Sequence, residues 1–498
     1  MLNLYYFISL SLCKSIDKAD SNLLQEQLYP SKESELRVIR LIKSAGTAAT
    51  AMSLPTTSSS TPLLASKTDS SVDEDVAHGG FKGSSFASAI FNLSTTVVGA
   101  GIMALPATQK QLGLPLGLVT IVFIGILTDS SLELLVRFSN SCKALSYGAV
   151  MESSFGHLGR TLLQVCIIVN NLGLLIVYMI IIGDVLSGTG SGTSHHRGLL
   201  ELWADGATWW NSRVVVLFLT TILILVPLVS FKRVDSLKFS SALSVALAIV
   251  FVVIMAGIAI AKLVAGKIPM PRLLPDVHDQ YSFWKLFTVV PVMVTAYICH
   301  HNVHPISNEL EDTSIMKKVC RSSVALCTLI YLATAMFGYL LFCENTMDDV
   351  LANFNADLGI PYGRILSAIV QLGYAVHLML VFPLLHFSLR LNVDALIFPR
   401  ALSLANDSWR FVWVTAILMG IIFFGSTLVP SIWAAFQFTG ATVGVSLGFI
   451  FPGAIAIRDQ AGIATNTDRI FAWTMVILAV VSSLTAITTN VVTLFNSS

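Results

Sequence analysis

The sequence predicts an all-α membrane protein of about eleven transmembrane helices, because its composition and its hydrophobic pattern agree. Of its 498 residues, 54% are hydrophobic and only 12% are charged, against roughly 25% charged in a soluble domain. The apolar residues gather in stretches of about 20, the length with which a helix crosses the hydrocarbon while bonding all its own amides. The net charge of +1 provides no basic field for nucleic acid, so we expect no nucleic-acid partner.

Eleven apolar stretches follow one another along the chain. They cover residues 86–107, 114–136, 161–186, 214–231, 239–264, 284–306, 320–342, 365–389, 411–430, 433–456 and 470–494. Lys and Arg are more frequent in cytoplasmic loops than in loops on the other side. With the N-terminus inside, the short inside loops hold fourteen Lys and Arg and the outside loops hold eight. This excess predicts a cytosolic N-terminus.

The chain divides into two parts by composition. Residues 1–83 are polar and rich in Ser and Thr, so they bury too little apolar surface to fold, and we expect a disordered cytosolic tail. Residues 84–494 contain all the apolar stretches and form the expected transmembrane domain.

The first stretch contains a weak point in its helix. Gly99 and Gly101 flank Ala100, and Pro106 follows. Glycine lowers helix stability by about 1 kcal/mol, so the helix is expected to unwind here. Taken alone, the same glycines also suit close packing of small residues between helices.

The sixth stretch contains a second weak point. Polar residues from Tyr297 to Asn302, and then His304 and Pro305, interrupt an otherwise apolar segment. Imidazoles at this depth are costly unless they have partners or line a cavity. Stretches one and six are corresponding members of two five-helix halves, and interruptions in matching positions of an inverted repeat point to a binding site at the membrane midplane.

These two breaks would release backbone groups of both signs. We expect free amides where the outer half of helix one starts near Gly101 or Ile102, and where the inner half of helix six starts near Asn302. Carbonyls would be released at Val98, Gly99, Tyr297 and Ile298. Amides suit a carboxylate and carbonyls suit an ammonium group, so the pair of breaks describes a site for a zwitterionic amino acid.

At these residues the sequence resembles plant vacuolar amino acid transporters of the AVT type, in the amino acid/auxin permease family. The resembling subgroup is similar to animal sodium-coupled neutral amino acid transporters. The resemblance covers nearly all of residues 84–494. It rests on F-N-L-S-T-T-V-V-G-A-G-I-M-A-L-P-A at 91–107, N-N-L-G at 170–173, C-H-H-N-V-H at 299–304 and Q-F-T-G-A-T at 437–442.

The resemblance implies a LeuT-like five-plus-five inverted repeat, alternating access and a vacuolar membrane. The substrate backbone would lie against residues 98–102, with selectivity from helices three, six, eight and ten. His301 stands where the family pattern has an aromatic residue. Sodium-coupled members use hydroxyls of helix eight, whereas residues 378–381 are Leu, Met, Leu and Val, so sodium coupling is not expected.

Further polar residues within the stretches complete the candidate set. The substrate-binding candidates are Val98, Gly99, Ala100, Gly101, Ile102, Asn170, Asn171, Tyr297, His300 and Asn302. The coupling or gating candidates are His301, His304, Glu309, His377, Tyr374 and Asp129. Histidine titrates near pH 6.5 and so suits proton coupling, although a structural hydrogen bond explains His377 equally well. Asp129 and Glu309 also suit ion pairs at helix ends.

The function expected from these residues is secondary transport of neutral amino acids, driven by protons in symport or facilitative. The expected partners are the amino acid, protons and the lipid bilayer. The alternative is a sensor that binds amino acids without moving them. We expect no enzyme, because no paired catalytic aspartates, H-E-x-x-H or nucleophile elbow occurs. No cofactor is expected, and no cysteine or carboxylate completes a metal site around the three neighbouring histidines.

Overall fold

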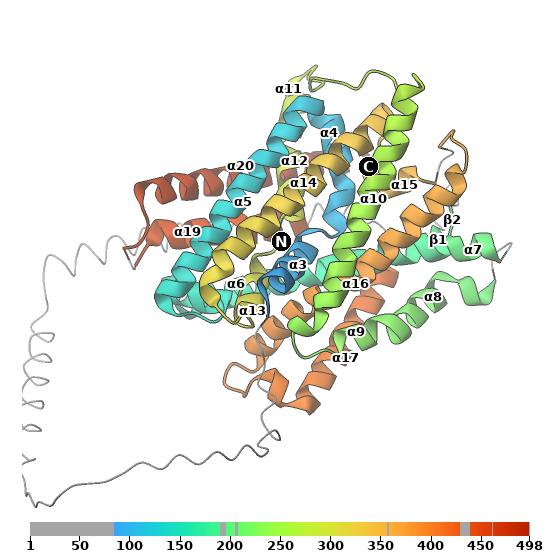
Figure 1. Ribbon diagram of the computed structural model, residues 1–498. Coiled ribbons are helices and arrows are strands. Elements are labelled where there is room, and N and C mark those ends of the chain that lie inside the picture. Colours follow the sequence, from blue (N-terminus) through green and yellow to red (C-terminus); the bar gives the residue numbers. More distant parts are fainter. Residues whose placement is uncertain are drawn as a thin grey trace, which may run out of the picture. The chain divides into compact units, whose positions relative to one another are not determined.

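The computed structural model describes residues 84–497 except 190–195, 205–207, 356–357, 429–438 and 461. These residues are almost entirely helical, as the sequence predicts (Figure 1). The one described sheet is the short antiparallel pair β1 (Gly188–Thr189) and β2 (His196–Arg197). The predicted tail and the start of the predicted stretch 433–456 lie outside the described residues.

The first half of the transmembrane region starts with a helix in two pieces. Its helices are α3 (Phe86–Val97), η1 (Ala100–Ala104), α4 (Leu105–Leu112), α5 (Leu114–Cys142), α6 (Tyr147–Ser187), α8 (Arg213–Thr220), η3 (Thr221–Leu225), α9 (Val226–Val229) and α10 (Lys238–Val264). Its short connecting helices are α7 (Leu199–Trp203), η2 (Trp209–Asn211) and η4 (Asp235–Leu237).

The second half also starts with a helix in pieces and is followed by one additional helix. Its helices are α11 (Gln280–Lys285), η5 (Leu286–Thr288), α12 (Val289–Ala296), α13 (His300–Ser307), α14 (Met316–Phe342), α16 (Gly363–Ile397), α17 (Ser408–Leu428), η9 (Gly440–Gly444), η10 (Ser446–Ile450), α19 (Phe451–Arg458) and α20 (Asn466–Ser497). Its connecting helices are η6 (Thr313–Ile315), η7 (Cys343–Asn345), α15 (Val350–Asn353) and η8 (Leu404–Asn406).

The number of spans agrees with the predicted pattern. Among the described residues, nine helices are long and apolar enough to cross a membrane, and α3 with η1 and α4 forms a tenth that bends by 50°. The predicted fourth stretch is the helix Arg213–Val229. At 1.5 Å per residue this helix is about 26 Å long, slightly short of a hydrocarbon core of about 30 Å.

One helix is longer than the sequence indicated. α6 begins at Tyr147, well before the predicted start at residue 161. Gly156 interrupts it with a φ of 68°, a conformation that glycine adopts without steric cost. The segment before this kink is polar enough that hydropathy alone did not identify it as part of the helix.

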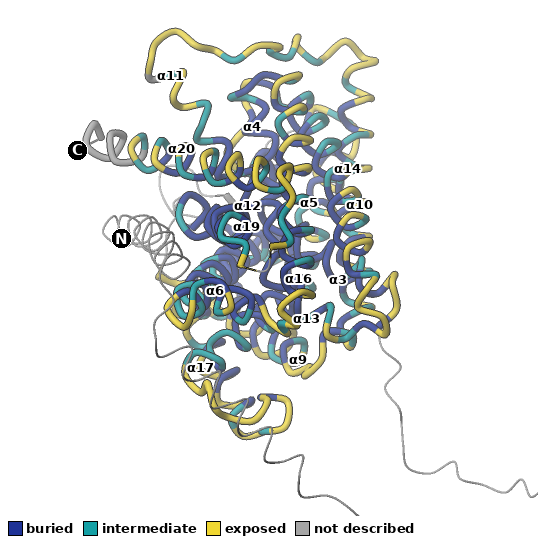
Figure 2. Tube along the Cα trace, turned by 90° about the vertical axis from the view of Figure 1, so that its left-hand side faces the viewer, coloured by how far each residue is buried: buried dark blue, intermediate teal, exposed yellow. Residues whose placement is uncertain are grey.

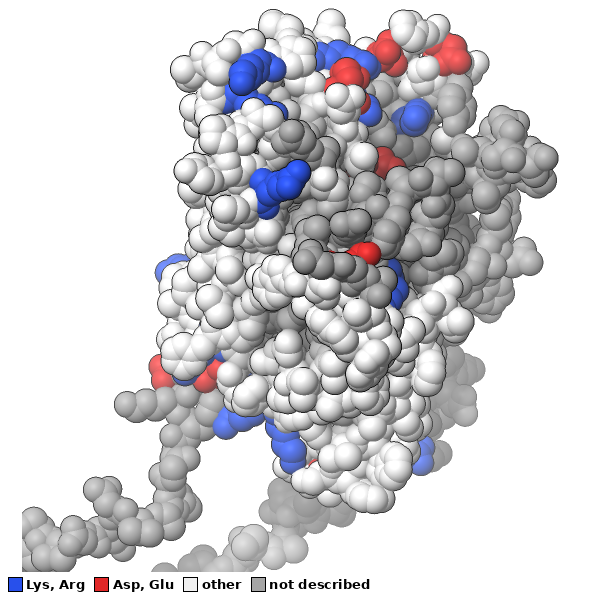
Figure 3. All heavy atoms as spheres, turned by 90° about the vertical axis from the view of Figure 1, so that its right-hand side faces the viewer, with Lys and Arg blue, Asp and Glu red and all other residues white. Residues whose placement is uncertain are grey.

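The surface has the character expected in a bilayer. In Figure 3, Lys, Arg, Asp and Glu gather mainly toward the upper and lower ends of the view. Large apolar side chains are exposed between the helix ends, for example Leu223 at 68% and Val253 at 62%. Figure 2 shows that the buried residues instead lie along the helices of the interior. Lipid tails are therefore the natural solvent of this surface.

The broken helices lie in the core of the molecule. α3 packs against α10 and α14, α16 packs against α6 and α10, and η1 contacts α12. Figures 1 and 2 agree that α4 and α11 lie at one end of the bundle, and α9 and α13 at the other. We call the first end the α11 face and the second the α3 face, because α3 begins there beside the end of α13.

Candidate substrate and coupling site

The first helix breaks at the predicted glycines. α3 ends at Val97, Gly99 is extended with a φ of −130°, and η1 begins at Ala100. Within the described residues, the amides of Gly99 and Gly101 reach no backbone carbonyl. The outer half therefore starts slightly earlier than the predicted Gly101 or Ile102.

Gly99 and Gly101 allow neighbouring helices to approach the first break more closely than a side chain would permit. A Cβ on Gly99 would overlap the Tyr178 hydroxyl, and a Cβ on Gly101 would lie 2.8 Å from the Cα of Ala296. The first contact joins the break to α6, and the second joins it to the end of α12. The two broken helices therefore meet backbone to backbone, so close packing by small residues accompanies the break.

The sixth helix also breaks where the sequence predicts. α12 ends at Ala296, and α13 begins at His300, two residues before the expected Asn302. In the described chain, the amides of Cys299, His300 and His301 have no carbonyl acceptor. Each break thus presents the N-terminal end of a helix, where unpaired amides and the helix dipole favour an anionic group.

One hydroxyl connects the two breaks. Tyr331 of α14 lies 2.7 Å from the carbonyl oxygen of Val97 and 2.6 Å from that of Ala296. A phenol has a single proton, so it donates to one of these carbonyls at a time. Its ring also packs against Tyr297 with centroids 4.9 Å apart. The last carbonyls of both broken segments therefore converge on the same buried point.

The released carbonyls of helix one are already occupied. His377 Nε2 lies 3.0 Å from the carbonyl of Val98, and the Tyr374 hydroxyl donates to the carbonyl of Gly99 at 3.0 Å. The expectation that these two carbonyls are open to an ammonium group or a cation is wrong for this structure, because donors from α16 satisfy them. The carbonyls of Tyr297 and Ile298 accept no hydrogen bond from any described residue, and they stay available.

His377 holds three helices together. Its Nδ1 lies 2.8 Å from the carbonyl oxygen of Ser244 and 2.9 Å from the Ser244 hydroxyl on α10. Its Nε2 faces Val98 of the first helix, and its ring stacks on Tyr374 with centroids 5.4 Å apart. The imidazole is fully buried. It stands between two carbonyl oxygens, which is the environment of a bound cation.

Asn170 and Asn171 on α6 are both fully buried. The amide nitrogen of Asn170 donates to the Asn171 side-chain oxygen at 3.1 Å. This bond leaves the Asn170 oxygen and the Asn171 nitrogen without a partner among the described residues. A buried unpaired acceptor and donor cost free energy, so the pair is suited to binding a polar group in the interior.

Two of the three neighbouring histidines have a defined tautomer. Ser131 donates to the carbonyl of Gly448 at 2.5 Å, so it accepts from His300 Nε2 at 3.0 Å. His304 Nε2 similarly meets Ser139 at 3.0 Å. In both rings Nδ1 has no described partner, and His301 has none at either nitrogen. The rings of His300 and His304 therefore connect α13 to α5, whereas His377 bonds to α10 and the first helix.

The remaining binding candidates have mainly structural contacts. The Tyr297 hydroxyl donates to Thr328 of α14 at 2.9 Å, so the phenol is directed away from the break and only the backbone of this residue is available. The Asn302 amide donates to Thr96 at 3.0 Å and connects α13 to the end of α3. Val98 and Ile102 are fully buried, and they border the break.

Glu309 joins three segments on the α3 face. Its carboxylate accepts from the amides of Val234 and Asp235 at 2.9 and 2.6 Å, and its carbonyl accepts from Ser84 at 2.6 Å. The end of helix six, the start of helix one and the connection before α10 are thereby joined. Asp129, by contrast, forms an ion pair with Arg321 at 3.2 Å between α5 and α14, away from the breaks.

Sequence reasoning did not identify four residues of this site. They are Ser131, Tyr178, Ser244 and Tyr331, which bond to or closely approach the broken helices or the buried histidines. Each is a polar residue within an apolar stretch, where an uncompensated hydroxyl is costly. That signal existed in the sequence, but it could not indicate which of many Ser and Tyr residues point toward the breaks.

Two discontinuous helices at the start of two five-helix halves define the class of LeuT-like secondary transporters. The crystal structure of MhsT in complex with L-phenylalanine is similar, with a TM-score of 0.50 at 13% identity, over 82% of this chain and 100% of that chain. A mutant manganese transporter from Eremococcus coleocola is similar with a TM-score of 0.53 at 12% identity, over 82% and 87%. These likenesses support the predicted fold.

The chain belongs to the family described as transmembrane amino acid transporter protein, whose model matches residues 82–495. The Arabidopsis thaliana proteins named amino acid transporter AVT6A and AVT6B are 57% and 55% identical, covering 85% and 88% of this chain and 92% and 95% of their own. A rat relative named among sodium-coupled neutral amino acid transporters is 26% identical, over 83% of this chain and 86% of its own. The resemblance drawn from the four motifs is confirmed.

Proposed function

We propose that this protein moves neutral amino acids across the vacuolar membrane by alternating access, coupled to protons, with its α3 face and N-terminus in the cytosol. The observation that carries the proposal is the meeting of two helix breaks with unpaired amides on both. The amides of Gly99, Gly101 and Cys299 suit the substrate carboxylate, and the open carbonyls of Tyr297 and Ile298 suit its ammonium group. The relatives' names as amino acid transporters support the same substrate class.

A neutral side chain fits the composition of the breaks. Residues 97–103 and 294–303 contain no Lys, Arg, Asp or Glu, so no fixed charge selects an anionic or cationic side chain. The imidazoles of His300 and His301 carry unpaired nitrogens, and Asn170 and Asn171 add one acceptor and one donor. These groups accommodate small polar side chains as well as apolar ones.

Proton coupling is supported by the contacts of His377. In the neutral ring, Nε2–H donates to Val98 and Nδ1 accepts from the Ser244 hydroxyl. In the protonated ring, Nδ1–H donates to the Ser244 carbonyl instead. Both protonation states therefore keep all ring nitrogens bonded, and a proton can arrive or leave without creating an orphaned polar group.

Gain or loss of a proton at His377 changes the net charge beside the broken first helix. No described Asp, Glu, Lys or Arg forms an ion pair or hydrogen bond with the imidazole. The phenol of Tyr374 on the same helix stacks on the ring, and Tyr178 and Asp349 lie near that phenol. Protonation strengthens the hold of α16 and α10 on Val98, and deprotonation weakens it, which links the proton to the position of helix one.

The test is uptake of a panel of labelled amino acids into proteoliposomes, with and without an imposed pH gradient. We expect uptake of neutral amino acids that a gradient accelerates. His377→Gln removes the titrating group and is expected to retain exchange at equal pH while losing gradient-driven accumulation. His386→Gln is the matched control, because His386 is buried on the same helix and its ring nitrogens have no hydrogen-bond partner in the described chain.

Other outcomes would identify the alternatives. Measurable binding without flux of any amino acid would defeat the transporter proposal and favour a sensor. Flux that ignores the gradient in the wild type would favour facilitated transport. A fluorescent fusion found only at the plasma membrane would overturn the vacuolar assignment.

A further inference from the structure

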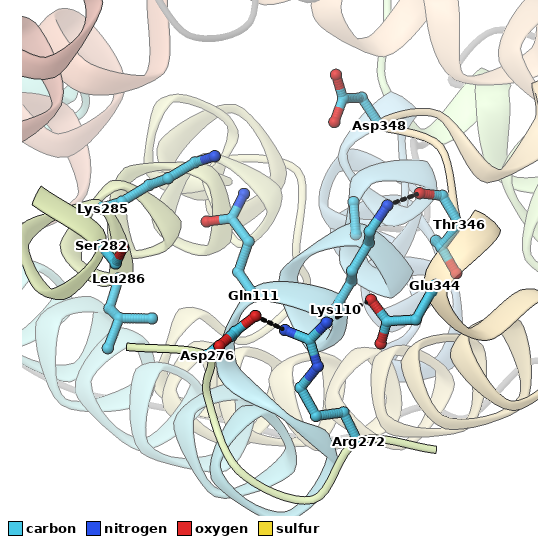
Figure 4. Close-up of a pocket in the computed structure, with 11 residues that line it drawn as sticks. Lys110, Gln111, Arg272, Asp276, Ser282, Lys285, Leu286, Glu344, Thr346 and Asp348 are labelled. Atoms are coloured by element: carbon cyan, nitrogen blue, oxygen red, sulfur yellow. Dashed lines mark hydrogen bonds and ion pairs between the residues drawn. The ribbon is translucent and has the colours of Figure 1, made fainter. Parts of the chain in front are cut away.

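A pocket of about 380 Å³ opens on the α11 face, separate from the helix breaks (Figure 4). Its walls are the end of α4, the segment before α11, α11 itself and the connection after α14. Lys110 and Gln111 on α4 lie ten residues beyond the start of η1, which corresponds to about 15 Å of helix. The pocket therefore lies at the ends of both broken helices that point away from the breaks.

Part of the charge in this pocket is neutralised internally. Arg272 forms ion pairs with Asp276 at 3.3 Å and with Glu344 at 2.6 Å. Lys110 donates to the carbonyl of Thr346 at 3.1 Å. These contacts connect α4 and the segment before α11 to the connection after α14. They also remove Arg272 and its two carboxylates as partners for a ligand.

Two opposite charges are left unpaired. Figure 4 shows Lys285 extending from α11 on one wall and Asp348 on the other, with Gln111 between them. Neither Lys285 nor Asp348 forms an ion pair or a side-chain hydrogen bond with another described residue. The side-chain oxygen of Gln111 is buried and also has no described partner. Partial desolvation raises the pKa of Asp348, while Lys110 and Lys285 oppose that rise.

We propose that this pocket is an outer binding site for zwitterionic amino acids, with the carboxylate at Lys285 and the ammonium group at Asp348. The inference rests on the proposed transport function and adds a first stop for the substrate before the helix breaks. The lining has three basic and three acidic side chains, so its balance favours a neutral zwitterion over an anion. The volume is at the low end for ligand pockets, which suits a small molecule.

The test uses the full chain in proteoliposomes and in detergent, with a labelled neutral amino acid that the wild type carries. Lys285→Gln and Asp348→Asn are each expected to raise the KM for entry from the α11 face about fivefold. Entry from the α3 face is expected to keep its KM. Lys267→Gln is the matched control, because Lys267 is exposed on the connection between α10 and α11 and does not line the pocket.

Two blocked ligands separate the two ends of the site. The methyl ester lacks the carboxylate, so it should bind the wild type less well than the free amino acid, and Lys285→Gln should reduce that difference about fivefold while leaving the part that the helix-break amides contribute. The N-acetyl amino acid lacks the ammonium group, and Asp348→Asn should reduce its disadvantage in the same way, leaving the part that the carbonyls of the helix break contribute. Binding is measured in detergent by competition, so these results do not depend on flux.

The outcomes distinguish this inference from the proposed function. If the wild type transports amino acids and both variants match it from either face, the outer site is refuted and the transport function stands. If chloride or phosphate competes as well as the amino acid does, the pocket is an anion site and the zwitterion proposal is wrong. If the wild type neither binds nor carries any amino acid, both proposals fail.

Discussion

The contact between Gly99 and Tyr178 allows a quantitative test of the break in helix one. Gly99 has a φ of −130°, which alanine also adopts, so Gly99→Ala adds no backbone strain. The added Cβ would overlap the Tyr178 hydroxyl and lie 3.1 Å from the ring carbon that carries it. Overpacking of this kind costs about 1–3 kcal/mol. We expect Gly99→Ala to lower thermal stability and to slow amino acid transport.

The second half of the prediction is a rescue. Tyr178→Phe removes the oxygen that the added Cβ would overlap. In the double variant most of the clash disappears, although the ring carbon stays tight. The two changes should therefore couple favourably by about 1–2 kcal/mol.

The assay is thermal unfolding in detergent of the two single variants and the double variant, together with their transport rates. Gly257→Ala on α10 is the control, because a Cβ there meets no atom within 4 Å, and alanine is a better helix former by about 1 kcal/mol. The close contact between the break and α6 would be refuted if the stability losses of the two single variants simply add in the double variant. It would also be refuted if Gly99→Ala is as stable as the wild type.

Three further predictions concern the surrounding contacts. Tyr331→Phe should lower stability by about 1–3 kcal/mol, because it removes the single O–H donor that two buried carbonyls share; thermal unfolding measures this loss, and an unchanged melting temperature would contradict it. Glu309→Ala should open the α3 face. Asn92→Cys should therefore react faster with a water-soluble thiol reagent when it is combined with Glu309→Ala than when Glu309 is present. Burial raises the pKa of Asp349 to about 6 from 3.8, so the folded state favours the protonated carboxyl. The stability that this carboxyl contributes is present below pH 4 and is lost as the pH rises through 6, by up to about 3 kcal/mol. Asp349→Asn keeps an N-cap for α15 and should therefore melt higher than wild type at pH 7.5 but not at pH 4; equal melting at both would refute the shift.

The breaks were predictable because their causes are local. Gly99 and Gly101 weaken a helix wherever it lies, and three imidazoles within five residues are costly in any bilayer. The position of each break was therefore correct to within two residues. The first part of α6, from Tyr147 to the predicted start at residue 161, was missed, because a polar helical segment gives no hydropathy signal.

Partners of the released carbonyls were not predictable in the same way. The sequence predicted either proton coupling or a structural hydrogen bond for His377. Its contact with Val98 joins residues 279 positions apart. Tyr331 bonds to Val97 across 234 positions and was not considered at all. Sequence periodicity shows which residues share a helix face, but it does not show which two faces meet.

The sequence by itself determined that this protein lies in a lipid bilayer, the approximate number of its spans and the location of its helix breaks, because these depend on hydrophobic length and local backbone propensity. Only the tertiary structure decided that α16 satisfies the carbonyls of helix one, that those of helix six stay open, and that Lys285 and Asp348 face one pocket. Hydrogen bonds and ion pairs act over about 3 to 4 Å, and distances of that size between remote segments are set by packing alone.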